Sequence, residues 1–152
     1  MRLKFTTRGR YSVQIMVDLA QHNSEGPVSL KSIADRHDLS ESYLEQLICE
    51  LRKADLVRSV RGAQGGYVLQ RDPQEIAVGE IIRSVAGSIA PVDCAYQTET
   101  QSCNCAPDEQ CLTRDLWVRL RDSVNALVDS IYLADLVKQP GDRQRADQLK
   151  IN

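Results

Sequence analysis

The fold is decided by residues 56–70, which read Leu56-Val57-Arg58-Ser59-Val60-Arg61-Gly62-Ala63-Gln64-Gly65-Gly66-Tyr67-Val68-Leu69-Gln70. Two short runs of strand-forming residues, 56–60 and 67–70, flank a connection that contains three glycines. Because glycine tolerates the positive φ angles of a tight turn, this spacing predicts a β-hairpin. Arg58 and Arg61 make the predicted hairpin basic.

Two helices are predicted near the start of the chain from the spacing of apolar residues. The first covers about residues 8–21, and either Thr6 or Thr7 is suited to cap its N-terminus. Its expected apolar stripe consists of Val13, Met16, Val17 and Ala20. The second helix is short, about residues 30–36, and Ser29 is placed to cap it.

A third helix is predicted from a cap at Ser40 to about residue 54. Four apolar residues recur in it at i, i+3, i+4 and i+7, namely Leu44, Leu47, Ile48 and Leu51. A tight connection at residues 37–39 precedes this helix, and the basic hairpin follows it. This order is typical of a winged helix-turn-helix, in which the second helix of the motif enters the major groove of DNA. We therefore expect a mainly α fold with a small β-hairpin, and we assign residues 1–72 to a DNA-binding domain.

A long helix is predicted in the second half of the chain. A short helix at about 78–86 and an irregular stretch to residue 111 come first, so residues 73–111 form a second segment. The long helix covers 113–130, and its apolar residues Leu116, Leu120, Val124, Leu127 and Ile131 are spaced like a coiled-coil seam. We expect residues 112–138 to mediate homodimerisation, the alternative being a stripe that packs only within its own chain. Residues 139–152 are polar and are expected to be a flexible tail.

The charge of the chain is divided unevenly between its halves. Residues 1–71 contain 11 basic and 8 acidic residues, whereas residues 72–152 contain 8 basic and 13 acidic residues. A basic half joined to an acidic half favours contact of the first half with a polyanion, although a merely solvated basic face has the same composition. No apolar run approaches the roughly 20 residues needed to cross a bilayer, and the start of the chain lacks the apolar core of a secretory signal. We therefore expect a cytoplasmic protein that does not bind membranes.

The polar face of the third helix supplies candidate DNA contacts. A glutamine can pair with adenine through two hydrogen bonds, and a glutamate can accept one from cytosine, which assigns these roles to Gln46 and Glu45. Hydroxyl side chains on the same helix are suited to phosphate contacts. Arg61 is the best candidate for insertion into a groove. The full candidate set is Arg8, Arg10, Ser40, Ser42, Tyr43, Glu45, Gln46 and Arg61. The alternative is an ordinary solvated helix face.

Four of the five cysteines, Cys94, Cys103, Cys105 and Cys111, fall within 18 residues. In a reducing compartment such a cluster indicates a metal or redox site more often than disulfides. Its spacing matches neither paired zinc motifs nor ferredoxin runs, and thiolates suit iron–sulfur clusters, zinc or copper(I). Incidental thiols in a loop are the alternative reading. Cys49 stands apart on the third helix and is interpreted as a bystander.

No catalytic constellation accompanies these thiols in the sequence. The two histidines, His22 and His37, both lie in the predicted DNA-binding half, far along the chain from the cysteine cluster. We interpret His22 as the end of a helix and His37 as a turn residue. No serine-based triad or pair of carboxylates is apparent, so we expect that the protein is not an enzyme.

Distinctive motifs lie along about residues 1–138, namely Thr7-Arg8-Gly9-Arg10-Tyr11, Ser42-Tyr43-Leu44-Glu45-Gln46-Leu47, Leu51-Arg52-Lys53, Val60-Arg61-Gly62 with Gly65-Gly66-Tyr67, Ala77-Val78-Gly79-Glu80-Ile81-Ile82, and Cys111-Leu112-Thr113 with Leu116-Trp117. They resemble the IscR-type family of winged-helix regulators. Members of that family are homodimeric bacterial transcription regulators. Many hold an iron–sulfur cluster, usually of the two-iron type, in the loop before the long helix, and its occupancy changes which promoters are bound.

The resemblance implies roles for individual residues. Residues at the positions of Ser40, Tyr43, Glu45, Gln46 and Arg61 contact DNA in that family, and the position of Glu45 discriminates between classes of promoter. Three cysteines, Cys94, Cys105 and Cys111, match the cluster ligands.

Two departures from the family pattern concern the fourth ligand. Arg114 stands where the family has histidine, and arginine cannot ligate a metal because it stays protonated. The stretch from Cys94 to Cys105 is also longer than usual and contains Cys103. We favour Cys103 as the fourth ligand, and the alternatives are another group, such as an N-terminal residue of the partner subunit, or no fourth ligand.

The sequence thus predicts a homodimeric transcription regulator, with double-stranded DNA as its partner and an iron–sulfur cluster, most simply 2Fe-2S, as its cofactor. By resemblance, its targets include genes for iron–sulfur cluster biogenesis, which it represses or activates. A regulator of the same fold that senses nitric oxide or cysteine supply is one alternative. An iron–sulfur carrier or redox protein is an alternative from another class, and the basic hairpin argues against it.

Overall fold

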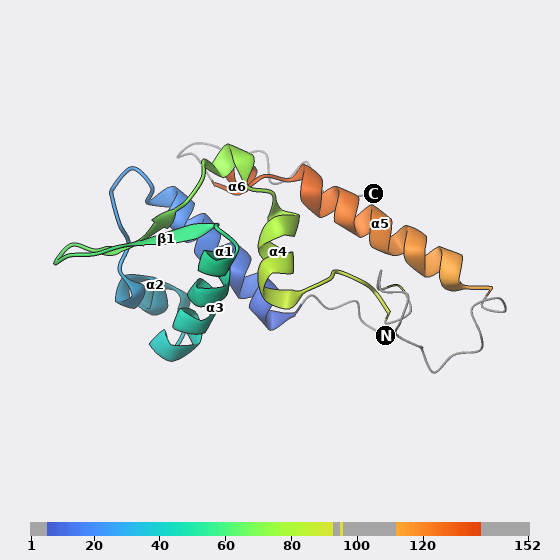
Figure 1. The fold of residues 1–152 in the computed structure, drawn as a ribbon, viewed down its shortest axis with the longest axis horizontal. Helices are drawn as coiled ribbons and strands as arrows, with labels where there is room; N and C mark the ends of the chain where they lie inside the picture. Colours follow the sequence, from blue (N-terminus) through green and yellow to red (C-terminus); the bar gives the residue numbers. More distant parts are fainter. Residues whose placement is uncertain (1–5, 93–94, 96–111, 138–152) are drawn as a thin grey trace.

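The computed structural model describes residues 6–92, 95 and 112–137 of the chain, and Figure 1 shows how their helices and strands are arranged. The elements in chain order are α1 (Thr7–Gln21), α2 (Leu30–His37), α3 (Glu41–Lys53), β1 (Val57–Val60), β2 (Gly66–Leu69), η1 (Pro73–Glu75), α4 (Val78–Ala86), α5 (Arg114–Ser130) and α6 (Leu133–Leu136). The structure is mainly helical with one two-stranded antiparallel sheet, as predicted.

The three helices of the first half begin at side-chain caps. The hydroxyls of Thr6, Ser29 and Ser40 accept hydrogen bonds from the backbone N–H groups three residues later, at 3.1, 3.1 and 3.2 Å. Each cap satisfies a donor that has no partner inside its helix, typically stabilising the helix by about 1 kcal/mol. The predicted caps are confirmed, and Thr6 rather than Thr7 caps α1.

The core of the winged domain is formed where α1 and α3 meet the other helices and the sheet. On α3 the predicted residues Leu44, Leu47, Ile48 and Leu51 are all buried. On α1 the predicted stripe was wrong in part, because Ser12, Ile15, Met16 and Leu19 are buried whereas Val13, Val17 and Ala20 are only half-buried. The reason is that α1 packs against α3, α4, α6 and β2, so it buries more than a single narrow stripe.

The hairpin packs on the connection between α1 and α2. Val57 pairs with Leu69 and Val60 with Gly66, so each strand differs by about one residue from the predicted range. Val28 and Tyr67 exchange two backbone hydrogen bonds, of 3.0 and 2.8 Å, which attach the connection to β2 like a third strand. A Cβ at Gly66 would lie 2.3 Å from the carbonyl oxygen of Val28. Only glycine therefore permits this approach.

The long helix α5 returns to the winged domain at its C-terminal end (Figure 1). Val78 N–H donates to the carbonyl of Ile131, and Leu133 N–H donates to that of Ile76, both at 2.8 Å. Val128 of α5 is buried against Val78 and Ile82 of α4. The end of α5 is thus joined to α4 and the residues before it by backbone hydrogen bonds and apolar packing, and α4 in turn packs on α1 of the DNA-binding domain. Within the described ranges, no helix is long and apolar enough to span a membrane.

Candidate nucleic-acid interface

The outer face of α3 carries most of the predicted DNA contacts. Ser40, Ser42, Glu45 and Gln46 are all exposed, because the leucines and the isoleucine of α3 turn its other face into the core. The Ser40 hydroxyl accepts the N–H of Tyr43 as the helix cap, and its own proton remains available for an acceptor such as a phosphate oxygen. The N-terminal turn of α3 therefore presents hydroxyl, carboxylate and amide groups side by side.

Tyr43 joins this face to the start of α1. Its ring meets that of Tyr11 edge to face, with ring centroids 6.2 Å apart and planes at 83°. The guanidinium of Arg10 lies 5.6 Å from the centre of the Tyr11 ring, within the range of a cation–π contact. Sequence reasoning named Arg10 and Tyr43 but missed Tyr11, although Tyr11 belongs to one of the motifs quoted for the family resemblance. The tyrosine pair brings a basic residue of α1 to the same region as the start of α3.

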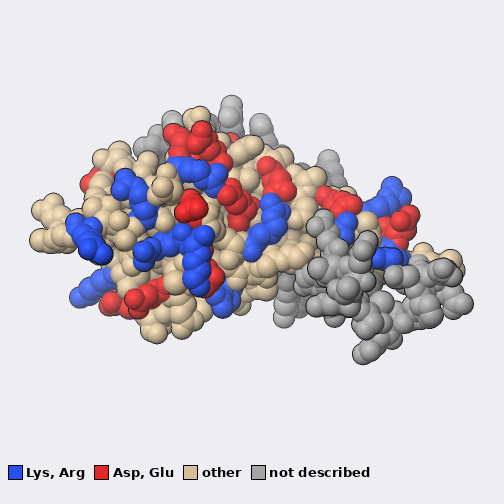
Figure 2. Space-filling model, in the orientation of Figure 1, with Lys and Arg blue, Asp and Glu red and all other residues tan. Residues whose placement is uncertain are grey.

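A basic groove runs between the second half of α3 and the wing strand β1. Its volume is about 460 Å³, and its lining includes Arg52, Lys53 and Arg58 together with the exposed thiol Cys49. A hydrogen bond from Lys53 to Glu50, 2.9 Å long, raises the pKa of this lysine above its ordinary value. On the face shown in Figure 2, basic side chains spread over the winged domain with acidic ones between them. The charge asymmetry of the sequence is thus not a uniform positive surface on this face.

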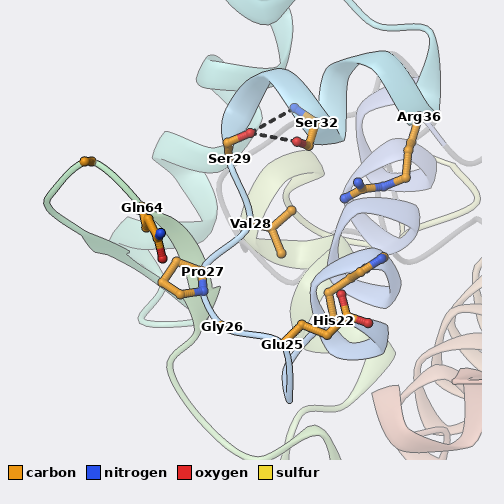
Figure 3. A pocket seen from close by; sticks show the side chains of 11 residues that line it. His22, Glu25, Gly26, Pro27, Val28, Ser29, Ser32, Arg36 and Gln64 are labelled. Carbon is orange, nitrogen blue, oxygen red and sulfur yellow. Dashed lines mark hydrogen bonds between the residues drawn. The ribbon is translucent and has the colours of Figure 1, made fainter.

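The wing tip lies across a second groove from α2. Figure 3 shows Gln64 of the wing turn on one side of this groove, and Ser32 of α2 and the cap residue Ser29 on another. The groove has a volume of about 350 Å³, and the two serine hydroxyls lie 2.8 Å apart. Arg61, the candidate for groove insertion, is exposed where β1 ends and the wing turn begins. The Val28–Tyr67 bridge holds the wing beside the helix-turn-helix motif.

Asp18 of α1 links the first two helices through an ion pair with Arg36 of α2. Its buried carboxylate accepts three hydrogen bonds from Arg36, of 3.0, 3.3 and 2.7 Å. His22 and His37 approach the same carboxylate at 3.3 and 3.7 Å. His22 is the C-terminal cap of α1 and contacts Asp18 within its own helix, as the reading of His22 as a helix end predicts. His37 is the last residue of α2 rather than a turn residue, and it reaches Asp18 across the contact between the two helices. Sequence reasoning missed Asp18, and the only available signal was an acidic residue within the apolar pattern of α1.

The long helix α5 leaves part of the predicted apolar seam uncovered in the single chain. The exposed fractions of Leu116, Leu120 and Leu127 are 57%, 36% and 61%. Val124 and Ile131 are half-buried instead, and Ile131 packs against the apolar cluster between α4 and α5. Two of the five predicted seam residues thus turn partly toward their own chain.

The four clustered cysteines, Cys94, Cys103, Cys105 and Cys111, lie outside the described residues. Within the described part of the chain, no group of three or more potential metal ligands comes together. The described residue next to the cluster is Ala95, which is buried and whose carbonyl accepts a 2.8 Å hydrogen bond from Arg121 of α5. The chemistry of the donor set, four thiols close together in sequence, fits an iron–sulfur cluster.

Comparison with known proteins places this arrangement in a family. Residues 5–139 match the Rrf2 family model, described as an iron-dependent transcriptional regulator. The chain is 46% identical over 144 residues to the HTH-type transcriptional regulator CymR of Bacillus subtilis, covering 95% of this chain and 96% of that protein. It is 43% identical over 150 residues to the regulator IscR of Aliivibrio salmonicida, covering 95% of this chain and 86% of that protein.

Solved structures agree with these relatives. The structure of CymR, the global cysteine regulator of B. subtilis, superposes with a TM-score of 0.73 at 46% identity, over 90% of this chain and 97% of that one. The structure of T. potens IscR superposes with a TM-score of 0.69 at 45% identity, over 99% and 93%. These relatives are transcription regulators, which supports the expectation that the chain is not an enzyme. The chain belongs to the Rrf2 family of winged-helix, DNA-binding transcription regulators.

Proposed function

We propose that the protein is a cytoplasmic homodimeric regulator whose affinity for its operator depends on an iron–sulfur cluster, most simply 2Fe-2S, held by Cys94, Cys103, Cys105 and Cys111. The observation that carries this proposal is the presence of four thiols within 18 residues, directly before α5. The description of the matching family as iron-dependent supports it. When bound, the cluster would supply a redox- and iron-sensitive group beside the dimer helix.

DNA binding in this proposal uses the N-terminal turn of α3 and the wing. The exposed Glu45 and Gln46 would contact base edges in the major groove, while Ser40, Ser42 and Tyr43 would contact phosphates. Arg8 and Arg10, both exposed at the start of α1, would hold the DNA backbone. The Tyr11–Tyr43 contact supports this division of roles, because it sets the start of α1 beside the start of α3.

Arg61→Ala is expected to weaken operator binding by about 10- to 100-fold. The reason is that a guanidinium inserted in a narrow groove is strongly attracted by the negative electrostatic potential of the DNA there. Arg61 is exposed, so its loss should leave the folding and the dimer unchanged. The measurement is a titration of a fluorescent operator at several salt concentrations. The matched control is Lys31→Ala, which removes an exposed basic side chain of α2. Wild-type affinity and salt slope in Arg61→Ala would remove Arg61 from the interface.

Dimerisation would occur through the uncovered apolar face of α5. Two-fold symmetry places the same leucines on both helices, so a stripe of three exposed leucines is suited to pair with its own copy. The dimer sets the distance between the two α3 helices, and the spacing of the two half-sites must match that distance. The dimer has competing arrangements that differ in DNA affinity. The iron–sulfur cluster can shift the balance between them only if the arrangements bind the cluster with different affinities. The expected change is about 1–3 kcal/mol, or 5- to 150-fold in affinity.

A second candidate is a regulator of the same fold that responds to cysteine supply. The 46% identity to CymR, the global cysteine regulator of B. subtilis, favours this candidate specifically. It requires no metal, so the presence of iron and sulfide in the purified protein separates it from the cluster proposal.

The deciding experiment is anaerobic purification followed by an absorption spectrum and counts of iron and acid-labile sulfide per chain. We expect a coloured protein with about equal iron and sulfide. Cys103→Ala is expected to lose most of that colour, whereas Cys49→Ala, which removes the exposed thiol of α3, should keep it. A protein free of iron and sulfide would reject the cluster and favour the cysteine-supply candidate. Full colour in Cys103→Ala would reject Cys103 as the fourth ligand.

A further inference from the structure

A ladder of polar side chains runs along one face of α5, on a different side from the exposed leucines. Arg121, Asn125 and Asp129 are spaced four residues apart, so they lie one above another on the helix. The Arg121 side chain is only 14% exposed, which is low for an arginine on a helix that projects from its domain. The guanidinium pairs with the neighbouring Asp122 through two nitrogens, at 2.8 and 2.7 Å, and its third nitrogen has a partner outside the helix.

The side chains nearest the N-terminus of α5 in this ladder bind the backbone carbonyls of Ala95 and Ile89. Arg121 donates a 2.8 Å hydrogen bond to the carbonyl of Ala95, the residue that directly follows Cys94 in the sequence. Asn125 donates to the carbonyl of Ile89 at 3.0 Å and to that of Arg121 at 2.8 Å. Two side chains of α5 thus bind two carbonyls of the same segment, and Ala95 itself is fully buried.

The members of the ladder nearer the C-terminus of α5, Asn125 and Asp129, contact α4. Arg83 donates one N–H to the side-chain oxygen of Asn125, at 2.9 Å, and pairs through another with Asp129. Gly79 of α4 makes room for this contact, since a Cβ there would lie 2.1 Å from the Asp129 carboxylate. Because α4 packs closely on α1, the ladder connects the segment beside Cys94 to the helices of the DNA-binding domain.

We propose that Arg121 and Asn125 are positioning residues, which hold the backbone of Ile89 and Ala95 against α5 and relay a displacement of these two residues through Arg83 to the winged domain. This inference rests on the proposed function, because the relay matters only if the cysteine cluster alters DNA binding. A carbonyl bound by a guanidinium is a charge-assisted contact, and its partial burial from water strengthens it. Displacement of Ile89 and Ala95 would therefore also disturb Asn125 and the hydrogen bond that Arg83 donates to it.

The test is Arg121→Ala, with Arg121→Lys as the conservative variant and Arg119→Ala as the matched control on the exposed surface of α5. The first readout needs no cluster and is amide hydrogen exchange of the metal-free protein. The amide of Ala95 donates to the carbonyl of Val92 at 3.0 Å, so it reports on the segment directly. We expect exchange at Ala95 to be at least about tenfold faster in Arg121→Ala, unchanged in Arg119→Ala, and partly restored in Arg121→Lys.

The second readout is the ratio of operator dissociation constants with and without the cluster. In Arg121→Ala we expect this ratio to fall toward one, while the affinity of the cluster-free protein and its dimerisation stay unchanged. Unchanged exchange at Ala95 would overturn the clamp. Faster exchange with an unaltered ratio would overturn the relay. Failure of the proposed function would show in the unsubstituted protein, as a ratio of one, and would overturn the relay while exchange still reports on the clamp.

Discussion

Leu120→Asp is expected to convert the proposed dimer into monomers, raising its dissociation constant by about 1,000-fold or more. The side chains of Leu116, Leu120 and Leu127 form an exposed apolar face on α5, and Leu120 lies between the other two. An aspartate there would have to bury its carboxylate against a partner helix, which costs several kcal/mol. Two-fold symmetry places the substitution in the interface twice, so the cost is counted twice.

The control for this variant is Ala126→Asp, which adds the same charge at an exposed position on another side of α5. Sedimentation equilibrium measures the mass of each variant, and operator titration measures its DNA affinity. We expect Ala126→Asp to remain dimeric. Leu120→Asp should lose about 100-fold or more in operator affinity, because a monomer binds only one half-site. A dimeric Leu120→Asp would show that this face of α5 is not the interface.

Gly66→Ala is expected to separate the wing from the helix-turn-helix motif and to destabilise the protein by about 3 kcal/mol. The new Cβ would lie 2.3 and 2.5 Å from the carbonyl oxygen and carbon of Val28 and 2.9 Å from the nitrogen of Ser29. All three are backbone atoms, which cannot rotate away as the end of a side chain can. The strand must therefore move, and the paired hydrogen bonds between Val28 and Tyr67 are lost with it.

Two measurements check this variant. A chain of this size should lose about 6–12 °C in Tm, and the amides of Val28 and Tyr67 should exchange much faster than in the wild type. Gly62→Ala is the comparison, because its new methyl group meets nothing within 4 Å. The φ of +123° at Gly62 strains an alanine there, so some stability is lost, but both amides should stay protected. Protected amides in Gly66→Ala would contradict the close approach of strand and connection.

Local sequence signals predicted most elements of the fold, because each depends on residues near one another in the chain. The three caps at Thr6, Ser29 and Ser40 determine where the helices begin, and the four apolar residues of α3 determine which face it buries. The glycine-rich turn predicted the hairpin in the same way. The exposed polar face of α3 then follows by helix geometry, since side chains opposite a buried stripe face solvent.

Contacts between distant segments could not be predicted in this way. The stripe of α1 was wrong in part because Ile15 and Leu19 are buried by several elements that local periodicity does not reveal. The buried Asp18 depends on Arg36, which belongs to another helix. The Tyr11–Tyr43 contact likewise joins residues of α1 and α3.

By itself, the sequence determined the order of the elements, the starts of the first three helices, the core face of α3 and the likeness to the IscR-type regulators. Only the tertiary structure decided which leucines of α5 stay uncovered and which seam residues turn toward their own domain. It also decided that Arg121, Asn125 and Arg83 connect the backbone of Ile89 and Ala95 to α4. The physical reason is that caps and periodicity act within a few residues, whereas burial and the partners of a polar side chain depend on segments that only folding brings together.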